Sequence, residues 1–314
     1  MSKDRKQEHI WEMADWWLVG SALVLMGLGL IMVYSASGVM AERLFADSNH
    51  FFLRQTLFAV LGLAVMGGAA WVPMGLIYKY VYIWLLVVLI LLGLTLTPFG
   101  VQAGGASRWL DLGRFSLQPL EVAKVALVLY LGYFLSHKQD KMKTFSVGFV
   151  PPVIITGIIA GMLLLQPDFG GAVFMAMLFF TMSMVGGTRL LYLLSSGLLC
   201  LGLGAYMIVS SPYRLKRWLV FLDPFQNAAD AGYQVVQSLY GLGLGGLFGQ
   251  GLGAGKQKLF FLPEGHTDFI VSVLGEELGF VGLSILFICL GVYMCRVLTV
   301  ALNQESLQDR FTAL

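Results

Sequence analysis

Two carboxylates and an imidazole lie close together in the stretch LPEGHTDF, residues 262–269. Glu264, His266 and Asp268 alternate along the chain, so in an extended segment their three side chains would project to one side. A carboxylate beside a helix N-terminus stays ionised at neutral pH, and an ionised carboxylate can act as a general base or bind a hard cation. The stretch therefore predicts acid–base or metal-assisted chemistry.

Helix capping is a simpler interpretation of the same stretch. Thr267 or Asp268 could cap the apolar helix expected after it, because their side-chain oxygens can accept hydrogen bonds from first-turn N–H groups. Capping explains one polar residue but leaves Glu264 and His266 unexplained. The two interpretations are compatible, since Asp268 could cap the helix and also act as a base.

A second group of charges lies in and before an apolar segment. Glu121 and Lys124 are three residues apart in QPLEVAK, so they share a helix face, and Pro119 suits the first turn of that helix. Charges in a membrane span are costly and mark a functional site, although an ion pair that only fixes packing is the alternative. Arg108 precedes them in GGASRWLDLG, and we expect it in the same site, with contact to lipid phosphate as the alternative.

Three further carboxylates have specific expected roles. Asp168 follows Pro167 between two apolar runs, where a turn and helix-cap role is favoured over catalysis. Glu276 and Glu277 lie inside the last apolar run, and we expect both to face the protein interior and to be paired there.

The elements that must position these residues are membrane-spanning helices. Hydrophobic residues make up 58% of the 314 residues and charged residues 12%, a composition that a water-soluble protein could not hide in its core. The net charge of +2 and the scattered basic residues exclude a nucleic-acid partner. All three cysteines lie in apolar runs, which argues against a disulfide framework or a zinc site.

A span needs roughly 20 apolar residues. Eight segments approach this length, and they predict an all-α polytopic membrane protein: 16–40, 55–78, 80–107, 119–136, 144–167, 169–188, 190–213 and 269–295. Residues 1–15 and 297–314 are then cytoplasmic tails around a membrane domain at 16–296.

Basic residues in short loops place the N-terminus and the loop HKQDKMK, residues 137–143, in the cytoplasm. Seven other basic residues then face outward against the usual bias, which suggests that they hold an anion: Arg108, Arg114, Arg214, Lys216, Arg217, Lys256 and Lys258. Residues 212–267 form a long extracytoplasmic loop, and loops of this length are usually functional. Within it, the glycine-rich part 231–255 is interpreted as interfacial or re-entrant, with a ninth span as the alternative.

Several blocks of sequence together resemble one family. GGASRWLDLG, QPLEVAK, QPDFG, PYRLKR, GYQVVQSL and GQGLGAGKQKLFFLPEGHTDFIVSVLGEELG are similar to the SEDS family (shape, elongation, division and sporulation) of peptidoglycan glycosyltransferases, typified by RodA and FtsW. IMVYSAS and GLGAGKQKL are closer to the division branch, FtsW. Members normally have ten spans, so we expect this chain to lack the last two, which puts its activity alone in question.

The resemblance implies polymerisation of lipid II at the outer face of the bacterial cytoplasmic (inner) membrane, at the division septum. It implies that Asp268, in the HTD motif, is the catalytic general base. It also implies partners: a class B penicillin-binding protein (a transpeptidase), other division proteins and membrane lipids.

The other candidate site residues are expected to bind substrate in the same cavity or to orient it: Arg108, Glu121, Lys124, Arg214, Arg217, Lys256, Lys258, Glu264 and His266. The outward basic residues, or a divalent cation such as Mg²⁺ or Mn²⁺, would stabilise the leaving pyrophosphate. No ligands for the metal can be assigned from the sequence.

Two functions of other classes remain as alternatives. A transporter that flips lipid II would use the intramembrane charges Glu121, Lys124, Glu276 and Glu277. A non-catalytic scaffold of the division machinery would recruit partners without turning over substrate.

Overall fold

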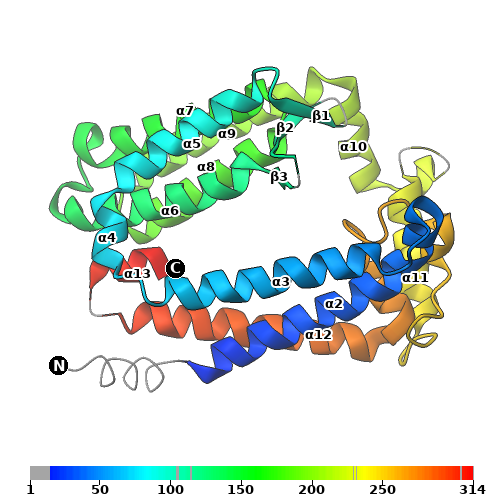
Figure 1. Cartoon of the computed structure of the whole chain (residues 1–314). Helices are drawn as coiled ribbons and strands as arrows, with labels where there is room; N and C mark the ends of the chain where they lie inside the picture. Colours follow the sequence, from blue (N-terminus) through cyan, green and yellow to red (C-terminus); the bar gives the residue numbers. More distant parts are fainter. Residues whose placement is uncertain are drawn as a thin grey trace, which may run out of the picture. The chain divides into compact units, whose positions relative to one another are not determined.

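The computed structural model describes residues 15–103, 106–113, 115–228, 230, 232–304 and 306–313 (Figure 1). Residues 1–14 of the expected N-terminal tail and Arg114 lie outside the described residues. The helices are α2 (Trp16–Phe45), α3 (His50–Ala69), α4 (Met74–Lys79), α5 (Val81–Thr95), α6 (Pro119–His137), α7 (Val150–Leu165), α8 (Phe169–Val185), α9 (Leu190–Val209), α10 (Pro212–Leu222), α11 (Tyr233–Gly245), α12 (Ile270–Leu302) and α13 (Leu307–Ala313). Short 3₁₀ or π turns are η1 (Gln139–Lys141), η2 (Phe145–Phe149), η3 (Phe225–Asn227) and η4 (Gln257–Phe261).

The eight predicted spans correspond in order to eight apolar helices. In the part of the chain that the structure describes, six are long and apolar enough to cross a membrane: α2, α3, α6, η2 together with α7, α9 and α12. The other two, α5 and α8, are shorter apolar helices. The expected all-α polytopic membrane fold is confirmed, and the chain is a multi-pass membrane protein.

The described part of the glycine-rich segment, residues 232–255, contains no helix long enough for a ninth span. Its helix, α11, has 13 residues, which at 1.5 Å per residue is about 20 Å long, less than the roughly 30 Å of a hydrocarbon core. Turns follow α11 as far as η4. The choice against a ninth span is therefore confirmed.

The third predicted span, 80–107, extends too far. Its helix α5 ends at Thr95, and a small antiparallel sheet follows, with strands β1 (Gly100–Ala103), β2 (Ala106–Asp111) and β3 (Ser116–Leu117) in the order β1-β2-β3. A Cβ on Gly100 would lie 2.1 Å from the Thr95 carbonyl oxygen, so the chain turns away from the helix where only glycine fits. Counting apolar residues could not detect this turn.

The second predicted span, 55–78, is divided in the same way. Its helix α3 ends at Ala69, and α4 begins separately after Pro73. Proline at this position has no N–H to continue a helix, so it separates the two elements.

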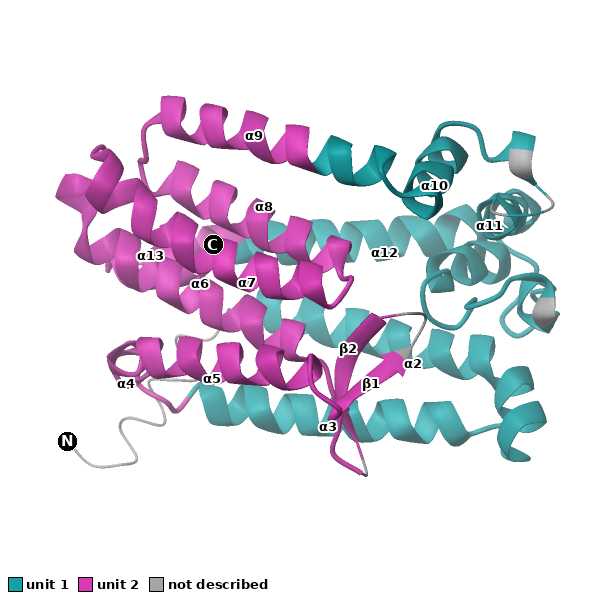
Figure 2. Ribbon diagram, turned by 90° about the horizontal axis from the view of Figure 1, so that it is seen from above, with its two compact units in different colours: residues 1–70, 204–297 teal, residues 71–203, 298–314 magenta. Residues whose placement is uncertain are grey.

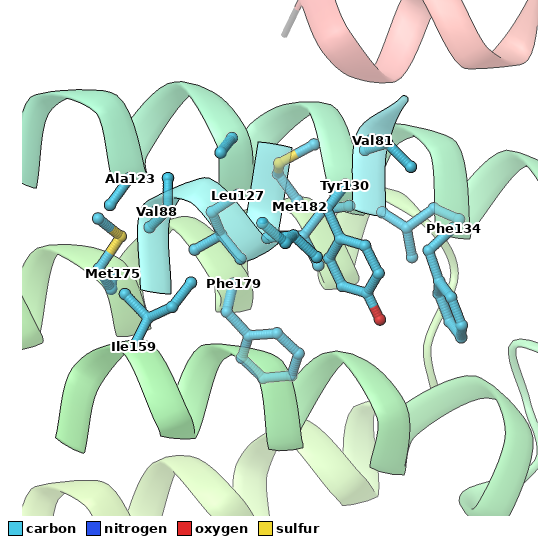
Figure 3. Close-up of a cluster of buried hydrophobic side chains, with 14 of the residues drawn as sticks. Val81, Val88, Ala123, Leu127, Tyr130, Phe134, Ile159, Met175, Phe179 and Met182 are labelled. Carbon is cyan, nitrogen blue, oxygen red and sulfur yellow. The ribbon is translucent and has the colours of Figure 1, made fainter. Parts of the chain in front are cut away.

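The chain divides into two compact units (Figure 2). The first comprises residues 1–70 and 204–297, and the second comprises residues 71–203 and 298–314. The second unit has a large apolar core in which α5, α6, α7 and α8 contribute side chains such as Val88, Leu127, Ile159 and Met175, all fully buried (Figure 3). In the first unit, Met32 and Ala36 of α2 pack with Val273 and Leu274 of α12.

Residues 297–314, expected as a cytoplasmic tail, contain the end of α12 and the short helix α13. Phe311 of α13 is buried in the core of the second unit. A Cβ on Gly132 of α6 would lie 2.4 Å from the Thr312 side chain, so α13 packs closely against α6. The cytoplasmic location of this segment remains a prediction.

Candidate active site

The LPEGHTDF stretch is a series of turns between η4 and α12. Glu264 has a φ of 56°, a left-handed conformation, so the segment is not extended and the expected alignment of its three polar side chains is wrong. Glu264 instead accepts a hydrogen bond from the Thr267 hydroxyl (3.0 Å to Oε2). The half-buried His266 ring packs against Phe51 of α3, with ring centroids 5.3 Å apart.

Asp268 lies two residues before the first residue of α12, and its side chain is exposed. Within the part of the chain that the structure describes, no group hydrogen-bonds to its carboxylate. The first turn of α12 is closed by backbone, with the Phe269 carbonyl accepting from Ser272 N–H at 2.9 Å. The described contacts therefore do not include the expected side-chain cap, and the carboxylate is available beside the positive end of a helix.

Glu276 and Glu277 are buried, as predicted, and each has partners from other segments. The Glu276 carboxylate accepts hydrogen bonds from the backbone N–H groups of Lys256 (2.8 Å) and Gln257 (3.1 Å). The Glu277 carboxylate accepts from Lys258 Nζ (2.7 Å), Ser35 Oγ (2.6 Å) and Gly253 N–H (3.0 Å). Both carboxylates therefore anchor the segment that precedes Asp268.

Lys258, which was expected to bind substrate, has a buried side chain with partners within the protein. Its side chain is only 6% exposed, and its ammonium group is paired with Glu277. It also donates to Ser35 Oγ of α2 at 3.1 Å. The sequence offered no sign of the Ser35 contact, because the two residues are 223 positions apart.

Helix α12 is interrupted at Gly279, which has a φ of 65° and a ψ of −161°. The carbonyls of Glu276 and Glu277 accept hydrogen bonds from Gln250 N–H (2.9 Å) and Gly251 N–H (3.0 Å). The N–H groups of Phe280 and Val281 donate to the carbonyls of Gly246 (2.9 Å) and Leu247 (3.1 Å). In a regular helix these four groups would pair with one another, so the loop 246–251 takes over their hydrogen bonds.

The remaining basic candidates of the first unit lie on α10 and before η4. Arg214 donates to the Met207 carbonyl (3.1 Å), and the exposed Arg217 lies over the Tyr213 ring, 4.7 Å from its centroid. Lys256 is exposed and uses its backbone N–H, not its ammonium group, to contact Glu276. Arg217 and Lys256 therefore present their charges to the surroundings.

Three candidate site residues belong to the second unit: Arg108, Glu121 and Lys124. Glu121 and Lys124 form an ion pair of 2.7 Å in the first turns of α6, with side chains 58% and 30% exposed. Arg108 on β2 donates to the Pro167 carbonyl (3.0 Å), and its Nε lies 3.7 Å from Asp168. Asp168 caps α8 by accepting from Gly171 N–H at 3.1 Å, which confirms the predicted cap.

Among the described residues, no three His, Cys, Asp or Glu side chains gather as a metal site. Around Asp268, the described side chains thus include no such group of three for the expected divalent cation.

Comparisons with known proteins agree with the resemblance of the sequence motifs. The family model for cell cycle proteins of the FtsW/RodA/SpoVE type matches residues 15–314. A probable peptidoglycan glycosyltransferase FtsW of Trichlorobacter lovleyi is 44% identical over 297 residues, covering 93% of this chain and 77% of the relative. Stage V sporulation protein E of Bacillus subtilis is 38% identical, covering 95% of this chain and 82% of the relative.

Two solved structures share the fold. One, described as "Structural coordination of polymerization and crosslinking by a peptidoglycan synthase complex", has a TM-score of 0.75 at 28% identity and covers 96% of this chain and 82% of that chain. The rod shape determining protein RodA of Thermus thermophilus has a TM-score of 0.66 at 27% identity, covering 96% of this chain and 80% of that chain. Sequence and fold together place this chain in the FtsW/RodA/SpoVE family of SEDS membrane proteins.

Proposed function

We propose that this chain is a peptidoglycan glycosyltransferase that polymerises lipid II during septal cell wall synthesis, with Asp268 as general base. The observation that carries the proposal is the exposed Asp268 carboxylate, which no described group binds and which follows a tightly anchored segment. The names of several relatives, probable peptidoglycan glycosyltransferase FtsW, support the same reaction class.

In this mechanism Asp268 removes the proton from the acceptor sugar hydroxyl while that oxygen attacks the anomeric carbon of the lipid-linked donor. The bond between the anomeric carbon and the pyrophosphate oxygen breaks, and the lipid pyrophosphate leaves with the electron pair. A carboxylate that is free of protein partners can accept this proton. We assign Arg217 and Lys256 to the developing negative charge, because both side chains are exposed, while Lys258 is withdrawn from this role by Glu277.

A divalent cation remains part of the proposal, although the protein residues alone do not form its site. Mg²⁺ is commonly held by one or two carboxylates together with substrate phosphates. The donor pyrophosphate would supply the phosphate ligands, and the carboxylate oxygen of Asp268 that does not take the proton would supply the other. Loss of activity in EDTA and recovery with Mg²⁺ or Mn²⁺ would support the cation, whereas unchanged activity in EDTA would remove it from the proposal.

We infer that the chain works in the bacterial inner membrane at the septum with a class B penicillin-binding protein. A related solved structure is described as coordinating polymerisation and crosslinking in a peptidoglycan synthase complex, which supports such a partner. The transport alternative has less support, because Glu276 and Glu277 are both committed to internal hydrogen bonds.

The decisive experiment replaces Asp268 with asparagine, which keeps the size of the side chain and removes the base. Purified Asp268→Asn with its transpeptidase partner should convert labelled lipid II into glycan at a rate reduced by about 100-fold or more, the range expected for loss of a general base. Asp47→Asn, a change at an exposed loop carboxylate, is the matched control and should polymerise normally.

Gel filtration and thermal unfolding in detergent should show that both variants are folded. Glycan of normal length and rate from Asp268→Asn would refute the assignment of the base. Lipid II flipping in vesicles that survives Asp268→Asn but is lost in Lys124→Ala would favour the transporter instead.

A further inference from the structure

We propose that Lys258, Glu277 and Ser35 form a buried positioning triad that fixes the segment carrying Asp268, and that Lys258 does not contact the substrate. The catalytic consequence of this inference rests on the proposed glycosyltransferase function. The three residues come from η4, α12 and α2, so the triad joins three separate parts of the first unit.

The contacts of the triad form a closed triangle. Lys258 Nζ donates to Glu277 Oε1 (2.7 Å) and to Ser35 Oγ (3.1 Å), and Ser35 Oγ donates to Glu277 Oε2 (2.6 Å). The Glu277 side chain is 0% exposed and the Lys258 side chain 6%. Two of the three N–H donors of this ammonium group are thus engaged, and the buried side chain leaves it little surface with which to bind a pyrophosphate.

The ion pair of Lys258 and Glu277 must be kept intact, because a buried charge without its partner destabilises the fold. Removing one member of a buried ion pair is strongly destabilising because it leaves an uncompensated charge, whereas replacing both members by well-packed uncharged residues of similar volume is often tolerated. A positioning role and a phosphate-binding role for Lys258 therefore predict different results for single and double substitutions.

A continuous series of contacts connects the triad with Asp268. The Leu262 N–H donates to the Gln257 carbonyl (2.9 Å), and the Gly265 N–H donates to the Leu262 carbonyl (3.2 Å). The Phe269 N–H donates to the Glu264 carbonyl (3.2 Å), and this hydrogen bond closes the turn that contains Asp268. Leu262 itself is only 4% exposed. A shift of η4 would thus be transmitted to the carboxylate.

Glu276 and the interrupted helix α12 hold the same segment through further hydrogen bonds. Glu276 binds the N–H groups of Lys256 and Gln257, and loop 246–251 pairs with α12 around Gly279. Without the Lys258 ammonium group, the segment would keep these backbone contacts but lose its hydrogen bond to Ser35 of α2 and its ion pair with Glu277. We therefore expect local loosening of residues 250–258 and displacement of Asp268, with the rest of the unit intact.

The test compares Lys258→Met with the double variant Lys258→Met/Glu277→Gln, each purified as the full chain with its transpeptidase partner. Two quantities are measured: kcat and KM for lipid II polymerisation, and hydrogen exchange of the backbone amides at 250–257. Lys258→Met should lower kcat by about 100-fold, the effect of a displacement of about 1 Å at a catalytic group, with little change in KM. Its amides at 250–257 should exchange faster.

The double variant should recover slow exchange and most of kcat, because it contains no unpaired buried charge. Lys256→Met removes an equal charge two residues away, and its amides should keep the exchange rates of the unmodified chain. If Lys258→Met does not fold, the KM of the double variant alone decides whether Lys258 positions the segment or binds the substrate.

A raised KM in the double variant, with exchange unchanged, would overturn the proposal and return Lys258 to substrate binding. Failure of the general-base assignment would be seen separately, as full activity of Asp268→Asn. In that event the exchange measurements would still test whether the triad holds the segment.

Discussion

Tyr78 connects α4 with α13 through a single hydroxyl group. Its phenol oxygen lies 2.8 Å from Thr312 Oγ1 and can donate to Asp309 Oδ1 at 3.1 Å. Burial, as the largest cause, raises the pKa of Tyr78 to about 12, with the Thr312 hydroxyl opposing this shift and the neighbouring Asp309 carboxylate adding to it. The hydroxyl is therefore protonated and able to donate throughout the physiological range.

Replacing Tyr78 with phenylalanine should destabilise the protein by about 1 kcal/mol, the typical net value of a hydrogen bond. Because the folded pKa lies above the usual 10.0, the contribution of the hydroxyl is complete below pH 10 and is lost as the pH rises through about 12. Thermal unfolding in detergent from pH 7 to pH 12 measures the difference. A gap between the two proteins that stayed constant across this range would contradict the assignment.

At the scale of residues, local patterns were predictable and distant contacts were not. The Asp168 cap follows from a proline, an aspartate and an apolar run in immediate succession, and the structure has that cap. Lys256 and Lys258 had equal standing as phosphate ligands, yet one is exposed and the other is paired inside the protein. Their difference depends on Ser35 and Glu277, which lie far away along the chain.

At the scale of elements, loop 246–251 and α12 complete each other's backbone hydrogen bonds. Gly249 has a φ of 80°, and a Cβ there would lie 2.1 Å from the Glu277 carbonyl oxygen. Gly253, in the same loop region, has a φ of 83° but open space around the position of a Cβ. The two glycines thus share a backbone conformation and differ in what surrounds them.

This pair of glycines gives a matched prediction. Gly253→Ala should cost only the strain of a left-handed residue, about 1–2 kcal/mol. Gly249→Ala adds a collision with backbone and should separate the loop from α12, lowering the yield of folded protein and the unfolding temperature well below those of Gly253→Ala. Equal unfolding temperatures for the two variants would mean that the loop does not pack tightly into the interruption of α12.

Apolar runs predicted the helices of the fold because length and hydrophobicity are local properties. The same criterion joined α5 to the strands β1 and β2, since the residues between them are also mostly apolar or small. It also gave no sign of the interruption at Gly279, which exists because another segment supplies the missing hydrogen bonds. Elements that depend on a distant partner are the ones that a local pattern misses.

For the whole molecule, the distribution of charge predicts how the chain is oriented in the membrane. The lysines of HKQDKMK surround η1, on the connection between α6 and η2. The Asp268 segment is expected on the opposite side, where a lipid-linked donor would be used.

Cysteine labelling tests this orientation directly. The chain has three cysteines of its own, Cys200, Cys289 and Cys295, so they are first replaced by serine. In that background Glu264→Cys should react with a membrane-impermeant maleimide in spheroplasts, and Lys141→Cys should react only after the membrane is permeabilised. The reverse pattern would invert the topology and place the Asp268 segment in the cytoplasm.

Because of the interruption at Gly279, the order in which the segments are synthesised affects how the protein folds. Residues 246–251 leave the ribosome before α12, so the groups that complete the interruption already exist when this helix enters the bilayer. In a gene permuted so that α12 is translated first, the helix would enter the bilayer without the loop, and the four groups would pair with one another as in a regular helix. Those bonds would have to open before residues 246–251 could take their place, so such a chain should reach the native fold more slowly, although it would contain every residue of the mature fold.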